Sequence, residues 1–295
     1  MNQLKTIKSI LLLILLGFIW GSGYTLAKFA MINGVPPLGY AFWQSLGPAL
    51  LLTLVCFATK NIPMFKPVYW PYFFICGLVG IAIPNTNMYF ISSHLPAGLL
   101  AVLVNTVPLL VYPLALLSGQ ERMDSWRLLA LVLGIAGILL IIGVNTSGLY
   151  STWTLLAMIS PLGFALCSVY IGAKQQNEIS ALHAAAGMLL AATLLLIPLV
   201  ISQNAFYSLS GPLTLVKQVI FLEILLSSLG YLIFFKLIRL AGPVFYSLTG
   251  GIVALTGLFW GYLIFNETPT SIQIMAVTLV ISAIFLLSWR QSKQS

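Results

Sequence analysis

Long apolar runs separated by short polar breaks extend along this chain from one end to the other. Each run of about 18–23 residues is long enough, at 1.5 Å per residue, to cross a hydrocarbon layer of about 30 Å as a helix. The breaks carry turn and capping residues such as Asn33-Gly34, Asp124-Ser125 and Gly242-Pro243. The pattern predicts ten membrane-spanning helices, at residues 9–30, 37–58, 69–90, 97–118, 126–144, 151–172, 182–202, 214–236, 243–265 and 270–289.

Two segments far apart in the chain resemble each other. The first predicted helix contains GFIWGSGYTLAK and the sixth contains GFALCSVYIGAK. Six residues recur at one offset of 146 positions, with Gly17, Phe18, Ser22, Tyr24, Ala27 and Lys28 returning as Gly163, Phe164, Ser168, Tyr170, Ala173 and Lys174. Glu121 after the fourth helix and Glu267 after the ninth keep the same offset. We therefore predict two repeats, residues 1–145 and 146–295, of five helices each.

An odd number of helices in each repeat has a consequence for topology. After five crossings the chain has changed sides, so the second repeat enters the membrane upside down relative to the first. Inverted repeats are typical of secondary transporters, which place the substrate site near the repeat interface and alternate between two oppositely facing states. The predicted fold class is an all-α polytopic membrane protein, with ten transmembrane helices as two inverted five-helix repeats.

The composition agrees with a membrane protein and excludes several other classes. The chain is 60% hydrophobic and 6% charged, whereas soluble domains have roughly 25% charged residues. The net charge of +8 does not indicate a nucleic-acid partner, because the basic residues lie between apolar runs and form no patch. The three cysteines lie inside apolar runs without metal-ligand spacing, and no nucleotide-binding loop is present. We expect no cofactor and no metal.

The distribution of basic residues predicts the orientation. With a cytoplasmic N-terminus, eleven of the 13 lysines and arginines fall on the cytoplasmic side, and only Lys28 and Lys217 fall outside. The first apolar run is longer than the core of a signal peptide and is duplicated inside the chain, so we interpret it as a retained helix. The prediction is a multi-pass protein of the inner (plasma) membrane with both termini in the cytoplasm.

Several motifs resemble the EamA family of the drug/metabolite transporter superfamily. They are Trp20-Gly21, the stretch LPAGLLAVLVNTVPLL, the acid in SGQERM, its repeat in IFNET, and ALVLGIAGILLIIG in the fifth helix. The resemblance covers the whole chain. It implies a ten-helix carrier of two inverted repeats that moves small metabolites without a cofactor. Members of that family often have a basic residue in the second helix, where this chain has Gln44.

Glu223 is the one carboxylate well inside a predicted span. Charged groups are costly in lipid, so this side chain must face protein, water or substrate. Ser227, Gly230 and Tyr231 lie on the same helical face. We predict that Glu223 couples protons or pairs with a charge on the substrate. The alternative is a structural carboxyl group bonded to a neighbouring hydroxyl.

Other polar and aromatic side chains fall at a similar depth in the first, second, third, fourth and eighth helices. A single asparagine or glutamine is expected to form a hydrogen bond to a neighbouring helix. The convergence of several such residues favours a binding site. Trp43, Tyr89 and Trp260 add aromatic surface for a ring or a quaternary ammonium. Pro108 is expected to kink the fourth helix. The predicted substrate-binding residues are Trp20, Tyr24, Gln44, Asn85, Asn105 and Tyr231.

Acidic residues also precede predicted helices at their ends. Glu121 and Asp124 come before the fifth helix and Glu267 before the tenth. A negative charge or an oxygen acceptor at that position stabilises the start of a helix. We expect these three residues to act at the N-termini of the helices that follow them.

These features together predict a secondary transporter that works by alternating access, either proton-coupled or facilitative. Its cargo is expected to be a small metabolite, an amino acid or a cationic or aromatic compound. It would act in the lipid bilayer as a monomer or homodimer. Two alternatives stay open, an intramembrane lipid-modifying enzyme and a channel-like membrane protein. The enzyme would generally need paired carboxylates, a histidine cluster or metal ligands.

Overall fold

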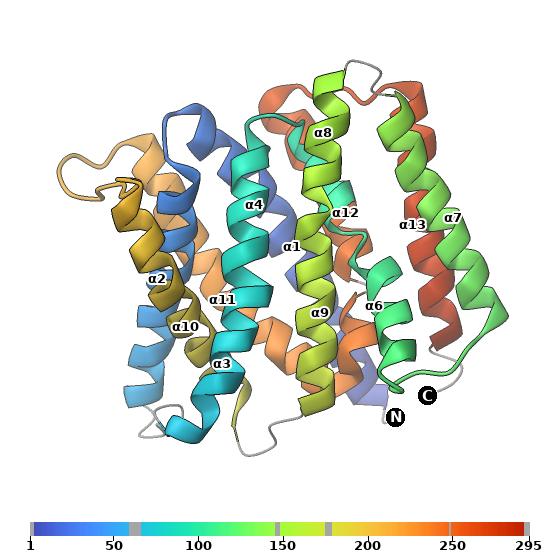
Figure 1. The fold of residues 1–295 in the computed structure, drawn as a ribbon, viewed down its shortest axis with the longest axis horizontal. Helices are drawn as coiled ribbons and strands as arrows, with labels where there is room; N and C mark the ends of the chain where they lie inside the picture. The colour runs from blue at the N-terminus through green and yellow to red at the C-terminus, as the bar shows by residue number, and fades with distance from the viewer. Residues whose placement is uncertain (1–2, 59–65, 145–147, 175–178, 248, 292–295) are drawn as a thin grey trace.

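The computed structural model describes residues 3–58, 66–144, 148–174, 179–247 and 249–291, and in these ranges it contains helices and no strand (Figure 1). The helices are α1 (Gln3–Ile32), α2 (Pro37–Ala58), η2 (Pro67–Tyr69), α3 (Trp70–Gly77), η3 (Leu78–Ala82), α4 (Ile83–Ser92), α5 (Ala97–Val104), α6 (Val107–Leu117), α7 (Ser125–Val144), α8 (Gly148–Ala157), α9 (Ile159–Lys174), α10 (Ala181–Ser202), α11 (Leu215–Ser247), α12 (Thr249–Phe265) and α13 (Ser271–Gln291).

The apolar runs predicted from the sequence all form helices. Within the described residues, seven helical segments are long and apolar enough to cross a membrane, by length and composition. Shorter apolar helices at Ser125–Gly137, Thr249–Phe265 and Ile274–Ala283 account for the three remaining predicted spans. The prediction of an all-α polytopic chain is confirmed.

The two halves run in opposite directions. The helix α1 begins at the lower edge of the molecule, whereas α8, which opens the second half, begins at the upper edge (Figure 1). The segment α9, which repeats part of α1, therefore runs against it. The chain ends at the same edge where it began (Figure 1). This is the inverted arrangement predicted from the 146-residue offset. The boundary predicted at residues 145 and 146 lies outside the described residues and stays a prediction.

Several crossings depart from regular helix within or at the end of the span. The third contains a π-helical turn, η3, just before Pro84. The fourth is broken between α5 and α6, at Asn105, because Pro108 lacks the N–H that would continue the helix. In α11 the helix continues past its predicted end at residue 236 to Gly242, whose φ of 83° favours glycine. Such interruptions release backbone groups from the helical ladder and are common at transport sites.

Glycines bring α1 and α12 close together. A Cβ atom at Gly21 would lie 1.8 Å from Thr256 Oγ1, and one at Gly17 would lie 2.5 Å from Ile252 Cγ2. The Thr256 hydroxyl also donates a hydrogen bond to the Gly17 carbonyl at 3.0 Å. Small residues allow such packing between helices in lipid. At the right-hand edge of the molecule in Figure 1, α7 and α13 pack mainly against each other.

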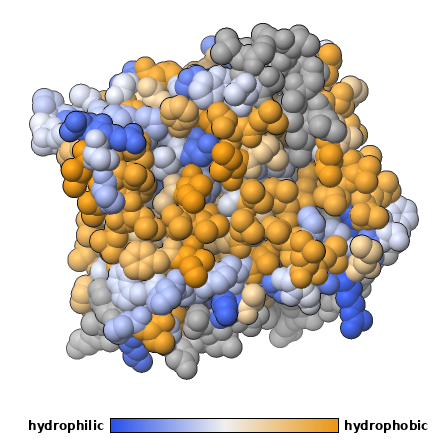
Figure 2. All heavy atoms as spheres, in the orientation of Figure 1, coloured by the Kyte–Doolittle hydropathy of each residue, from blue (hydrophilic) through white to orange (hydrophobic). Residues whose placement is uncertain are grey.

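The outer surface has an apolar belt. Figure 2 shows hydrophobic side chains across the middle of one face, with hydrophilic residues gathered towards its upper and lower margins. Large apolar residues on α2 and α11 point outward, including Leu54 at 63% and Leu225 at 60% exposure. A surface of this kind is suited to acyl chains.

Candidate functional site

A cavity lies where helices of the two halves meet. Its volume is about 90 Å³, enough for several water molecules. These irregular segments contribute Gly80 in η3, Asn105 between α5 and α6, and Tyr246 beyond the kink at Gly242. The lining residues are Ile19, Trp20, Gly23, Tyr24, Gln44, Gly80, Asn85, Met88, Tyr89, Asn105, Val107, Phe164, Cys167, Ser168, Met188, Glu223, Leu226, Ser227, Tyr231, Phe234 and Tyr246.

All seven residues predicted for the site line this cavity. They come from α1, α2, α4, the end of α5, and α11. The seven are Trp20, Tyr24, Gln44, Asn85, Asn105, Glu223 and Tyr231. Their roles in binding and coupling stay predictions.

A chain of hydrogen bonds runs through the cavity wall towards Glu223. The Asn85 side chain donates to Gln44 Oε1 at 3.0 Å, and Gln44 donates to Ser227 Oγ at 3.1 Å. Ser227 then donates to Glu223 Oε1 at 2.7 Å. The chain links α4, α2 and α11. Every donation points towards the carboxylate, so the network supports Glu223 as an acceptor.

Two tyrosine hydroxyls complete the polar part of the wall. The Tyr231 hydroxyl accepts from Asn85 at 3.2 Å and from Gln44 at 3.4 Å. The Tyr24 hydroxyl accepts from Asn105 at 2.9 Å, which ties α1 to the break in the fourth crossing. These interhelical bonds hold the polar groups in place, as expected for buried side chains in a membrane protein.

Glu223 is the one charged residue among those that line the cavity. Its side chain is buried, with 7% of the residue exposed. Gly23 on α1 faces it, and a Cβ atom there would lie 3.7 Å from Glu223 Oε2, an ordinary contact distance. The absence of a side chain at Gly23 therefore leaves this oxygen open towards α1.

Aromatic rings form another part of the wall. Trp20 contacts Phe234 and Tyr246 with ring centroids 5.8 and 5.9 Å apart, and it meets Tyr231 edge to face at 6.2 Å. Two of the aromatic residues considered from the sequence lie away from the cavity. Trp43 donates to the Tyr207 carbonyl at 2.7 Å, and Trp260 packs against Phe259.

The second half contributes residues that the sequence reasoning missed. Outside α11 they are Phe164, Cys167 and Ser168 on α9 and Met188 on α10, and α11 adds Leu226 and Phe234. A signal was present, because Phe164 and Ser168 repeat Phe18 and Ser22 of α1. The outward side of α1 carries Phe18, which is 51% exposed. Phe18 and Phe164 are therefore equivalent in the sequence repeat but lie in different environments.

The expectation that Glu267 acts at the N-terminus of the following helix, α13, is wrong. The Glu267 carboxylate accepts from the backbone N–H groups of Ala97 at 3.0 Å and Gly98 at 3.2 Å, at the start of α5. It also pairs with Lys28 of α1 at 2.5 Å. Glu267 thus joins the second half to two helices of the first, at the end of the molecule where α1 finishes.

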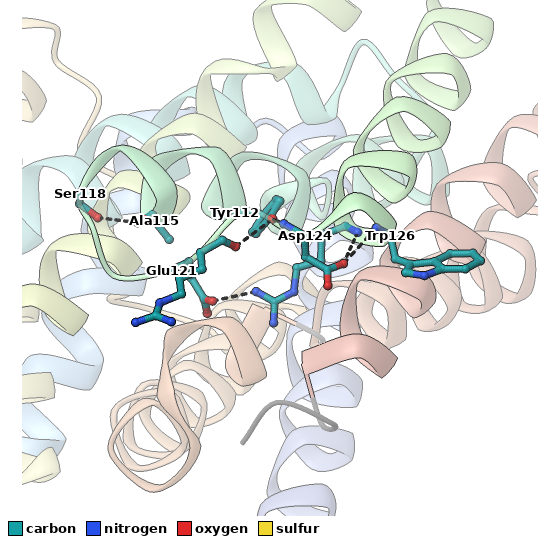
Figure 3. Close-up of polar contacts among 8 residues, drawn as sticks. Tyr112, Ala115, Ser118, Glu121, Asp124 and Trp126 are labelled. Atoms are coloured by element: carbon teal, nitrogen blue, oxygen red, sulfur yellow. Dashed lines mark hydrogen bonds and ion pairs between the residues drawn. The ribbon is translucent and has the colours of Figure 1, made fainter.

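The equivalent acid at the other end has different partners (Figure 3). Glu121 pairs with Arg127 of α7 at 2.8 Å. Asp124 accepts from the backbone N–H groups of Trp126 at 3.0 Å and Arg127 at 3.1 Å, which confirms it as the cap of α7. Tyr112 accepts from the Asp124 N–H at 2.9 Å. This cluster joins α6 to α7 within the first half.

Comparison with known proteins identifies the family. The profile of the EamA-like transporter family matches residues 7–143 and, a second time, residues 151–289. The chain belongs to the EamA-like transporter family. The two matches fall on either side of the predicted repeat boundary.

Several relatives of this EamA-like chain carry transporter names. The uncharacterized transporter YvbV of Bacillus subtilis is 26% identical over 100% of this chain and 96% of its own length. The uncharacterized inner membrane transporter YedA of Escherichia coli K12 is 28% identical over 92% and 87%. The protein PecM of Dickeya dadantii is 25% identical over 91% and 88%. The EamA-like chain is therefore a multi-pass membrane transporter.

A solved structure shares the fold. One protein crystal structure superposes with a TM-score of 0.67, covering 96% of this chain and 98% of the other at 15% sequence identity. At that identity the likeness shows the fold alone. It agrees with the EamA-like architecture described above.

Proposed function

We propose that this EamA-like protein is a secondary transporter that carries a small metabolite across the inner membrane by alternating access. The cargo binds in the cavity, where Glu223 provides proton coupling or a charge partner. The observation that carries the proposal is the cavity itself, because both inverted halves build it and one acid lies in its wall. A site at the repeat interface is the arrangement that lets two opposed states share one binding place.

The ion pairs at the two ends support alternating access. Glu121 and Glu267 end their helices in the same way, since each N–H donates to the carbonyl six residues earlier, at 3.2 Å and 3.3 Å. Their side chains nevertheless differ. Glu267 reaches across the halves to Lys28, whereas Glu121 pairs with Arg127 of its own half. In a protein that alternates between two states, equivalent residues of the two halves are expected to have different partners in either state.

Lys174, the repeat counterpart of Lys28, is exposed. If the two ends alternate, the opposite state brings Lys174 towards Glu121 and releases Lys28 from Glu267. The structure then represents the state closed at the Lys28 end. With the orientation set by the basic residues, that end faces outside and both termini face the cytoplasm.

Glu267→Gln is expected to shift the protein towards the state that is open at the Lys28 end. The amide oxygen still accepts from the start of α5, but the charge that holds Lys28 is lost. The measurement is an electron-spin distance distribution between labels at Ser93→Cys and Thr268→Cys, which are exposed residues of the two halves. The variant should gain a longer-distance component.

Glu121→Gln is the matched control for that measurement, because it removes the equivalent charge at the other end. It should leave the Ser93–Thr268 distance distribution unchanged or move it towards the short component. Equal distributions for wild type and Glu267→Gln would show that the Lys28 ion pair does not control this end.

The function itself is tested in two steps. A thermal-shift screen of purified protein against metabolites finds compounds that stabilise the folded state. Counterflow of a stabilising compound in proteoliposomes then distinguishes mechanisms. A carrier concentrates labelled compound against excess unlabelled compound, a channel only equilibrates it, and an enzyme converts it without vesicles. Failure of counterflow for every stabilising compound would contradict the proposal.

A further inference from the structure

We propose that the cavity selects aromatic monoamines, compounds in which a protonated amine accompanies an aromatic ring with no carboxylate beside it. This rests on the proposed function, since it takes the cavity as the transport site. It chooses between the amino acids and the cationic or aromatic compounds that the sequence left open. The inference follows from the charges, the unused hydrogen-bonding atoms and the rings of the cavity wall.

The charge of the wall favours a cation. Among the described residues that line the cavity, one carries a carboxylate, Glu223, and none is a lysine, arginine or histidine. The second helix carries Gln44 at the cavity. A carboxylate brought into this space would be desolvated beside Glu223 without a cationic partner. That arrangement is strongly unfavourable in a buried site.

The side-chain amide groups of Gln44 and Asn85 donate their hydrogen bonds to other protein groups. Gln44 Nε2 donates to Ser227 and Tyr231, and Asn85 Nδ2 donates to Gln44 and Tyr231. Each amide nitrogen carries two hydrogens. Both are therefore used, and neither amide has a donor left for a substrate.

Asn105 follows the same rule. Its Nδ2 donates to the Tyr24 hydroxyl at 2.9 Å and to the Ala101 carbonyl at 2.7 Å. The carboxylate and amide groups of the wall keep unused acceptors. In the part of the chain that the structure describes, Glu223 Oε2, Asn85 Oδ1 and Asn105 Oδ1 accept no hydrogen bond. The donors of the described wall residues for which no acceptor is seen are neutral groups, the hydroxyls of Tyr24, Tyr89, Tyr231 and Tyr246 and the indole N–H of Trp20.

A protonated primary amine complements this set. It brings three N–H donors and one positive charge and has no acceptor to satisfy. Trp20, Tyr89, Tyr231 and Tyr246 supply ring faces and edges at the same cavity, which suits both an aromatic ring and a cation. An amino acid shares the amine but adds a carboxylate, and the described lining residues offer it neutral donors but no cationic partner beside Glu223.

Matched compounds test the inference directly. Tyramine and tyrosine differ by one carboxylate, as do phenethylamine and phenylalanine. Inhibition of counterflow, or stabilisation in a thermal-shift titration, should need at least about 100-fold more of the amino acid than of the amine, because an unpaired buried charge is rejected strongly. Equal potency within either pair would overturn the inference.

Gly23→Ala supplies a variant that is expected to fold. Its methyl group fits at ordinary contact distance from Glu223 Oε2 and covers that oxygen. The half-maximal concentration of tyramine should rise about tenfold or more, while the melting temperature without ligand stays unchanged. A normal tyramine response in a folded Gly23→Ala protein would also contradict the inference.

The outcomes separate this inference from the function on which it rests. If a compound other than an amine shows counterflow that Glu223→Gln or Gly23→Ala alters, the transporter proposal stands and the monoamine class is wrong. If no compound in the screen shows counterflow, both fail. If the amines show counterflow and their amino-acid partners do not, both are supported.

Discussion

Glu223→Gln is expected to abolish transport driven by a proton gradient, and uptake should fall to the level of protein-free liposomes. Glu223 is the one charged residue among the described residues of the cavity wall, and 7% of it is exposed. A glutamine side chain cannot take up and release a proton as a carboxyl group does, so coupling at this position is lost. The fold should persist, because the glutamine oxygen can still accept from Ser227, which lies 2.7 Å from Glu223 Oε1. The measurement is pH-driven uptake in proteoliposomes, with the melting temperature as the test of folding.

Asp124→Asn is the matched control for the loss of a carboxylate. Asp124 lies at the start of α7, away from the cavity lining, and asparagine caps a helix about as well as aspartate. Transport by this variant should match wild type. Normal dependence on the proton gradient in a folded Glu223→Gln protein would remove Glu223 from the coupling mechanism.

Gly21→Val is expected to produce the largest loss of stability among substitutions in α1. Even a Cβ atom would lie 1.8 Å from Thr256 Oγ1, 2.8 Å from Thr256 Cβ and 3.2 Å from the Val253 carbonyl oxygen. Overpacking typically costs about 1–3 kcal/mol, occasionally more, and here α12 must move away from α1. The thermal midpoint in detergent should fall by several degrees, together with the yield of folded protein.

Gly23→Val controls for the loss of a glycine in the same helix. The nearest atom to a Cβ at Gly23 is 3.7 Å away, so its stability should fall much less than that of Gly21→Val. Equal losses for the two variants would show that helix propensity, and not the contact between α1 and α12, sets the cost.

The architecture was largely predictable because lipid imposes strong rules. Every backbone group inside the bilayer must be paired within its own segment, so an apolar run of sufficient length has to be a helix. The 146-residue offset then gave the inversion. The convergence of Gln44, Asn85 and Glu223 was predictable for a related reason. Polar side chains that cannot face lipid must turn inward, where few places accept them.

The partners of the end residues could not be predicted. Glu267 precedes α13 in sequence, so local rules place it at that helix. The structure pairs it with Lys28, which lies 239 residues away, and with the start of α5. Such contacts depend on how the helices are packed. The π-helical turn η3 had no signal of its own either, because a one-residue change in helical bonding leaves the apolar pattern intact.

The contribution of α9 illustrates a limit of repeat reasoning. Phe164 and Phe18 match in sequence, yet Phe164 lines the cavity and Phe18 is 51% exposed. The sequence offset relates positions along two helices. The offset does not indicate whether a given position faces the cavity or the lipid. That depends on the neighbouring helices of the other half.

The central claim is that one cavity opens alternately to the two sides of the membrane, and accessibility of Leu226 tests it most directly. Leu226→Cys would be placed in a chain with Cys56, Cys76 and Cys167 replaced by alanine, since Leu226 lines the cavity. Leu225→Cys is the control, because Leu225 is 60% exposed on the apolar belt. In oriented vesicles, a charged membrane-impermeant thiol reagent should label Leu226→Cys from either side and Leu225→Cys from neither. Labelling of Leu226→Cys from one side alone would contradict alternating access.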